Sequence, residues 1–148
     1  MGVFDKEIET IESLRLIIHD SIKEAFRRYD FVILDYLTNK QWFQKGQKSD
    51  GKIIKPAYSR ITIKIKQAKG DPYDRVTLRD TGKLYKSIDL IAGERALIAR
   101  ITVEYFRKLE LKYGKRILGI QDQFLEEFCE NYILPQIKKN IDDKFTTL

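Results

Sequence analysis

Hydrophobic residues recur at steps of three and four over residues 5–29, which is the spacing of one face of an α-helix. Acidic residues cluster at the start of this segment and two arginines lie near its end, and both placements favour the helix dipole. The pattern therefore predicts a long amphipathic helix, stabilised mainly by burial of its apolar stripe. That stripe consists of Ile8, Ile11, Leu14, Ile18, Ile22, Ala25, Phe26 and Tyr29.

The pattern over residues 30–37 is compatible with two structures. The helical spacing continues through Ile33 and Leu37, but the dense apolar run also fits a buried strand. Thr38 and Gln41 have the spacing of a capping box, which predicts a short helix from residue 39 that carries Trp42 and Phe43.

Strand patterns follow in the middle of the chain. Three isoleucines alternate with polar residues over residues 61–66, after a turn at Ser49-Asp50-Gly51 and before Lys69-Gly70-Asp71-Pro72, and this predicts a strand with a polar outer face. Two further alternating runs flank a turn at Gly93-Glu94, and they predict a β-hairpin over about residues 87–102.

Two helices are predicted after the hairpin. The first covers residues 103–113 and ends at Gly114. The second runs from about residue 122 to about residue 144, with Asp122 as its cap and a kink at Pro135. The expected fold is one α+β domain over residues 1–148, with a long N-terminal helix, a small antiparallel sheet with a β-hairpin, and C-terminal helices.

The composition excludes several kinds of binding site but does not indicate a function. The 148 residues include one cysteine and one histidine, which excludes an internal disulfide and any multi-cysteine or multi-histidine metal site. We expect Cys129 to be a small buried residue and His19 to lie on a helix surface or at the edge of the core. Glu126 and Glu130 share a helix face, and we interpret them as a solvated acidic face. We expect no metal and no cofactor.

The positive charge is concentrated in the middle of the chain. Residues 40–86 carry 13 basic and 4 acidic residues, whereas residues 1–39 have a net charge of −3 and residues 87–148 are neutral. This segment is either a basic surface for nucleic acid or an acidic protein, or an ordinary lysine-rich solvated face. The candidate partner contacts are Arg60, Lys64, Lys66, Lys69, Arg75 and Arg79.

Several classes of protein lack support in the sequence. The first residues have no apolar signal core, no apolar run is long enough for a membrane span, and residue 6 does not fit a myristoylation pattern. We therefore expect synthesis in the cytoplasm and no contact with a membrane. No glycine-rich phosphate loop and no nucleophile elbow is present, and we expect no enzymatic activity.

One local string is informative beyond composition. Residues 78–88 contain Leu78, Asp80, Thr81, Gly82, Leu84, Ser87 and Ile88 in the order Leu-x-Asp-Thr-Gly-x-Leu-x-x-Ser-Ile. This string resembles the core pattern of a tailed-phage group that covers virion-morphogenesis, tail-completion and head–tail joining proteins. A looser resemblance extends over residues 38–135 and includes Gln41-Trp42, Gly46, Asp50-Gly51 and Tyr58-Ser59.

The resemblance implies a structural protein of a virion. Its partners would be other tail or neck components, and it would form a homo-oligomeric ring. The alternative function, suggested by the basic charge of residues 40–86, is nucleic-acid binding. The residues themselves predict a structural turn, in which Asp80 or Thr81 caps a short helix over residues 83–87, Gly82 permits a tight backbone, and Leu84 and Ile88 pack together. An aspartic protease would need a second carboxylate opposite Asp80.

Overall fold

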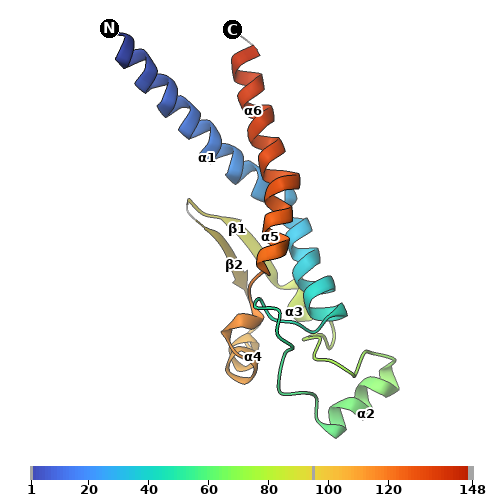
Figure 1. The fold of residues 1–148 in the computed structure, drawn as a ribbon. Helices are drawn as coiled ribbons and strands as arrows, with labels where there is room; N and C mark the ends of the chain where they lie inside the picture. Colours follow the sequence, from blue (N-terminus) through green and yellow to red (C-terminus); the bar gives the residue numbers. More distant parts are fainter. Residues whose placement is uncertain (1, 95, 147–148) are drawn as a thin grey trace.

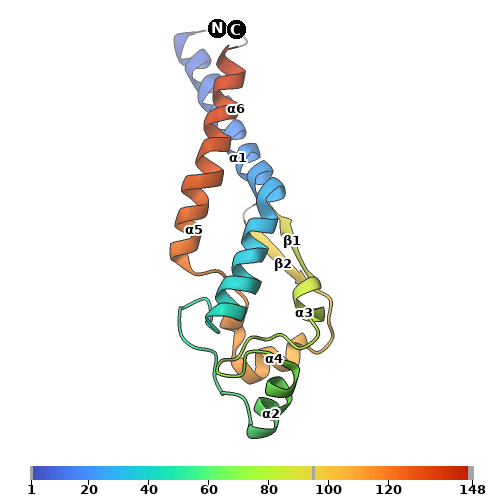
Figure 2. The ribbon, with the colours of Figure 1, turned by 90° about the vertical axis from the view of Figure 1, so that its right-hand side faces the viewer.

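The computed structural model describes residues 2–94 and 96–146. The chain forms a long N-terminal helix, a two-stranded antiparallel sheet and C-terminal helices (Figure 1). Helices make up 64% of the chain and strands 8%, so the predicted α+β class is confirmed. The molecule is elongated, with both termini at one end and the helices α2 and α4 at the other (Figures 1 and 2).

The N-terminal helix is longer than the apolar stripe alone predicted. Helix α1 covers Val3–Asp35 and continues without interruption into η1, a π-helical segment over Tyr36–Gln44. Residues 30–37 are therefore helical. The predicted new helix start near residue 39 is wrong, because the Thr38 hydroxyl group donates a hydrogen bond back to the Leu34 carbonyl oxygen instead of capping a helix. Gln41 is fully buried, and its amide group donates to the Gly119 carbonyl oxygen.

The C-terminal helix packs along α1. It consists of α5 (Asp122–Phe128), the π-helical η3 (Cys129–Ile133) and α6 (Leu134–Thr146). The cap prediction is wrong by one position, because Gln121 holds the N-cap position and Asp122 is the first helical residue. Cys129 is exposed, contrary to expectation, while its neighbour Phe128 is buried. The side chains shared between α1 and this helix form one core cluster, built on Ala25, Ile33, Phe128 and Ile133.

A polar contact joins α1 and α6 closer to the termini. The Asn140 side-chain amide donates hydrogen bonds to the Ser21 hydroxyl oxygen at 2.9 Å and to a Glu24 carboxylate oxygen at 3.0 Å. Ser21 is fully buried, so this pairing satisfies a hydroxyl group inside the interface. Beyond it, residues 2–12 of the chain are all exposed.

The predicted hairpin is present. Strand β1 (Ile88–Ala92) pairs with β2 (Leu97–Ile101) in antiparallel register, with Ile88 opposite Ile101. Leu90 and Leu97 contact the cluster between α1 and the C-terminal helix, which explains why the hairpin lies against α1 (Figure 2). The other face carries the opposed pair Ile91 and Ile98, which are 38% and 52% exposed.

A second core cluster fills the end of the molecule that is remote from the termini. Helix α4 (Phe106–Tyr113) and the short η2 (Lys115–Ile117) enclose Trp42, whose indole nitrogen donates a hydrogen bond to the Ile117 carbonyl oxygen at 2.8 Å. The predicted helix over residues 103–113 is thus confirmed with a later start. The buried members of this second core cluster are Leu37, Trp42, Ile54, Val76, Leu78, Leu84, Ile88, Phe106, Tyr113 and Ile117.

The predicted strand over residues 61–66 is wrong, because this segment is the helix α2 (Arg60–Lys69). The Ser59 hydroxyl group caps it by accepting a hydrogen bond from the Thr62 amide at 3.2 Å, and Gly70 ends it in the left-handed conformation at φ 75°. Ile61 and Ile65 are 73% and 51% exposed, so the alternating isoleucines are not buried against a sheet.

Candidate functional site

The Asp-Thr-Gly corner forms a turn that leads through a short helix into the hairpin. The predicted cap by Asp80 or Thr81 is wrong, because Gly82 holds the N-cap position and no side chain caps the helix. Gly82 adopts a left-handed backbone at φ 83°, a conformation that glycine tolerates at low cost. The Thr81 hydroxyl oxygen accepts a hydrogen bond from the Lys83 amide at 3.3 Å, and the short helix α3 (Lys83–Lys86) follows. Leu84 and Ile88 are both buried in the second core cluster, so the corner fixes where β1 begins.

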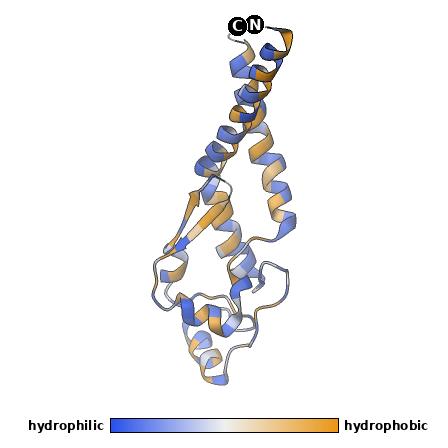
Figure 3. Cartoon of the chain, turned by 90° about the vertical axis from the view of Figure 1, so that its left-hand side faces the viewer, coloured by the Kyte–Doolittle hydropathy of each residue, from blue (hydrophilic) through white to orange (hydrophobic). Residues whose placement is uncertain are grey.

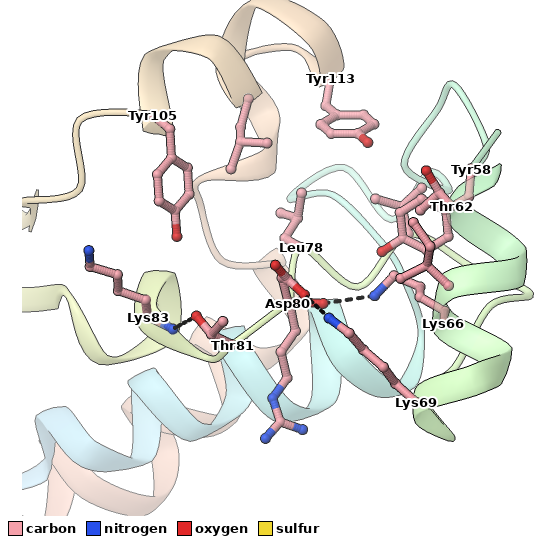
Figure 4. A pocket seen from close by; sticks show the side chains of 14 residues that line it. Tyr58, Thr62, Lys66, Lys69, Leu78, Asp80, Thr81, Lys83, Tyr105 and Tyr113 are labelled. Carbon is pink, nitrogen blue, oxygen red and sulfur yellow. Dashed lines mark hydrogen bonds and ion pairs between the residues drawn. The ribbon is translucent and has the colours of Figure 1, made fainter.

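Two lysines of α2 attach this helix to the corner. The Lys69 ammonium group lies 2.8 Å from an Asp80 carboxylate oxygen, and the Lys66 ammonium group donates to the Arg79 carbonyl oxygen at 2.8 Å (Figure 4). Lys66 is only 7% exposed, and its ammonium group lies 4.9 Å from the centre of the Tyr58 ring. Lys66 therefore belongs to the internal structure of this region, although the sequence placed it among surface contacts.

The ion pair shifts both of its members toward the charged state. The hydrogen bond from Lys69 lowers the pKa of Asp80, and the hydrogen bond to Asp80 raises the pKa of Lys69. The Asp80 side chain is 77% exposed, so water screens this attraction strongly. Asp80 is a charged surface group at neutral pH and is held in place by α2.

Two tyrosines position the buried segment before the corner. The Thr77 amide donates to the Tyr58 hydroxyl oxygen at 2.9 Å, and the Tyr85 hydroxyl group donates to the Thr77 carbonyl oxygen. Burial raises the pKa of the Tyr85 phenol. Thr77 is 1% exposed, so both hydrogen bonds satisfy backbone groups that water does not reach.

A cleft of about 680 Å³ opens between α2, residues 76–83 and α4. Figure 4 shows Tyr105, which directly precedes α4, and Tyr113 of α4 reaching toward it, with Tyr58 and the lysines of α2 on the opposite wall. Its lining combines an apolar and aromatic surface with four cationic side chains and one carboxylate. The ionisable members are Lys66, Lys69, Arg79, Lys83 and Asp80.

The six candidate contact residues do not form one surface. Lys66, Lys69 and Arg79 come together at the cleft, whereas Arg60 and Lys64 are exposed on α2 outside its lining. Arg75 is held away from partners, because its guanidinium group donates to the Phe43 carbonyl oxygen at 2.7 Å and pairs with Asp74 at 2.6 Å. Arg79 also lies over the Phe43 ring, 5.3 Å from its centre.

Among the described residues that line the cleft, no second carboxylate lies opposite Asp80, as an aspartic protease would require. Asp80 is the one acidic residue among those that line the cleft, and its nearest charged partner is a lysine. Within residues 2–94 and 96–146, no three His, Cys, Asp or Glu side chains are grouped to hold a metal ion. Among the same residues, no helix combines the length and the apolar character that crossing a bilayer requires.

Sequence reasoning missed the aromatic wall of the cleft. Tyr105 and Tyr113 lie eight residues apart at the two ends of α4, whereas Tyr58 is distant in the sequence, and only the fold places it on the opposite wall. The position of α2, which forms part of the cleft, did have a signal in the sequence: Ser59 and Gly70 mark a helix start and a helix end around residues 60–69.

Searches with protein-family models, curated proteins and solved structures found no significant match to this chain.

Proposed function

We propose that this chain is a structural virion protein of a tailed phage or prophage, which acts in tail completion or head–tail joining by oligomeric assembly. The observation that carries the proposal is the Asp-Thr-Gly string together with its surroundings. The string resembles the core of that phage group, and each of its seven positions has a conformational or packing role here. Leu78, Leu84 and Ile88 are buried, Asp80 pairs with Lys69, Thr81 and Gly82 shape the turn, and Ser87 donates to the Leu84 carbonyl oxygen.

The proposed mechanism is assembly through surfaces that the corner orients. Because Leu84 and Ile88 anchor the start of β1, the hairpin projects from a fixed base. Its exposed Ile91 and Ile98 form an apolar pair at one face, and such a pair is suited to packing against a neighbouring subunit. Contacts between unlike surfaces of neighbouring copies would then close a ring.

Nucleic-acid binding is the second candidate, favoured by the exposed cations Arg60 and Lys64 on α2. Binding through phosphates predicts an affinity that falls steeply as salt rises, because each neutralised phosphate releases counterions. Titration of labelled duplex DNA at several salt concentrations tests this. Absence of binding at low salt would remove the second candidate.

The proposed function is tested by inactivating the gene in the genome that carries it and inducing particle production. The expected result is a mixture of filled heads and separate tails in electron micrographs, restored to complete particles when the intact gene is supplied in trans. Complete infectious particles in the absence of the gene would contradict the proposal.

A further inference from the structure

The N-terminal end of α1 is an exposed apolar and acidic tip. Val3, Phe4, Ile8 and Ile11 are 72%, 79%, 54% and 64% exposed, and apolar residues continue to the end of this projecting helix (Figure 3). Residues 3–12 also contain four carboxylates and one lysine, which gives the tip a net charge of −3. Within the described residues, Lys144 and Phe145 at the end of α6 line a hollow together with Lys6, Glu9 and Thr10. The four apolar side chains of the tip nevertheless keep more than half of their surface exposed.

The cleft beside the corner has the complementary character. Its aromatic and aliphatic lining is accompanied by four cations and one carboxylate, a net charge of +3. Lys83 is exposed, and Lys69 is half exposed although it pairs with Asp80, so a ligand that enters from solvent can reach both ammonium groups. An occupant that matches this lining needs an apolar, preferably aromatic, side chain flanked by carboxylates.

We propose that the tip of α1, residues 3–12, from one copy of the chain docks into this cleft of a second copy. Phe4 and Ile8 enter between the tyrosines of the cleft, and the neighbouring carboxylates approach Lys69 and Lys83. This contact rests on the proposed assembly function and specifies which surfaces of the subunit carry it.

The two surfaces cannot satisfy each other within one molecule. The tip lies at the end of the molecule that holds both termini, and the cleft lies between α2 and α4 at the opposite end (Figures 1 and 2). A contact between tip and cleft therefore joins different copies head to tail. Such a heterologous contact repeats along a series of subunits and closes a ring when its rotation permits.

Two double variants disable one partner surface each. Phe4→Gln with Ile8→Gln removes the apolar tip, and Lys83→Glu with Tyr105→Ser alters the cleft. All four residues are exposed, so circular dichroism should show an intact fold. Matched controls change exposed residues outside these surfaces: Leu16→Gln with Phe31→Gln on α1, and Leu111→Ser on α4 with Lys115→Glu on η2.

Sedimentation velocity of the full chain over a range of concentrations gives the test. We expect the wild type and both controls to self-associate and each disabled variant to sediment as a monomer. We expect an equimolar mixture of the two disabled variants to form a heterodimer, because one supplies an intact tip and the other an intact cleft.

The contact would be overturned by a wild type that stays monomeric, by disabled variants that associate as the wild type does, or by controls that lose association equally. A mixture of the disabled variants that stays monomeric would also overturn it. These results are separable from failure of the proposed function. If the chain is required to join heads to tails but does not associate through tip and cleft, only the proposed contact is refuted. If it associates in this way but is dispensable for virions, only the proposed function is refuted.

Discussion

The Lys69 ammonium group lies 2.8 Å from the Asp80 carboxylate and joins the end of α2 to the Asp-Thr-Gly corner. The aspartate is therefore an attachment point for a helix, and its charge is matched by a cation from eleven residues earlier in the chain. This pairing accounts for an aspartate in the string without assigning it a chemical step.

Replacing Asp80 by Asn should weaken the attachment of α2 slightly, because the pair is exposed. The pKa of Asp80 is lowered in the folded chain, so the stabilisation is present above its ordinary value of 3.8 and disappears as pH falls through the lowered value. Urea unfolding at neutral and acidic pH should show a wild-type advantage over Asp80→Asn that shrinks as pH falls below about 4 and vanishes below the lowered pKa of Asp80. Asp20→Asn, at an exposed position on α1, is the control. A pH-independent difference would contradict the ion-pair role.

Lys66 should matter for stability, and Lys64 should not. Replacing Lys66 by Met removes the donor to the Arg79 carbonyl oxygen, and we expect a loss of about 1–3 kcal/mol in the free energy of unfolding. Lys64→Met, on the exposed side of the same helix, should change this free energy by less than about 0.5 kcal/mol. Urea unfolding followed by the fluorescence of Trp42, the single tryptophan, measures both. Equal effects of the two variants would contradict the internal role of Lys66.

Tyr85→Phe removes the hydrogen bond to the buried Thr77 carbonyl oxygen and should cost about 1–2 kcal/mol. Because burial raises the pKa of Tyr85 above its ordinary value of 10.0, the folded chain keeps this proton at a pH where the unfolded chain loses it. The wild type should therefore lose stability as pH rises above about 10, and the variant should lose less. Tyr105→Phe, at a 41% exposed position, is the control. Parallel alkaline profiles for wild type and Tyr85→Phe would refute the argument.

Ser59→Ala should destabilise α2 by about 1 kcal/mol, because the Thr62 amide loses its capping acceptor. Ser13→Ala, inside α1, should have no such cost. Hydrogen exchange of the amides in residues 60–69 reports the local effect. Unchanged protection of these amides in Ser59→Ala would show that the cap does not determine this helix.

Neutralising the exposed cations of α2 tests their role as partner contacts. Arg60→Gln with Lys64→Gln should leave the fold intact, since these side chains have no structural contact comparable to that of Lys66. If they contact a partner, the double variant should reduce the joining of heads to tails. Counts of complete particles in a complementation assay measure the effect. Wild-type counts would remove Arg60 and Lys64 from the contact surface.

The elements with one consistent pattern could be predicted from the sequence. The stripe from Ile8 to Tyr29 identified α1, and the paired runs around Gly93 identified the hairpin. The expected burial of the stripe is wrong for its N-terminal part, where Ile8 and Ile11 are exposed. The failure at residues 61–66 has a physical cause: alternation of isoleucine with polar residues is also compatible with a short exposed helix, and the capping signals at Ser59 and Gly70 decided the outcome. A period of two predicts a strand only where a sheet exists to bury one face.

The position of the turn at Asp80, Thr81 and Gly82 was predictable because its determinants are local, although the N-cap of the following helix is Gly82. The cleft was not, since its walls come from α2, α4 and the segment between Val76 and Lys83, and only the tertiary fold places them together. The same holds for the burial of Lys66 and for the contacts that hold the partly exposed Arg75 against Phe43 and Asp74.

The most direct test of a structural role in the virion is quantitative mass spectrometry of purified, complete particles from the genome that carries this gene. The account predicts that the intact chain is present in several copies per particle, in a fixed ratio to the other tail or neck proteins. Complete particles that lack the chain would contradict it.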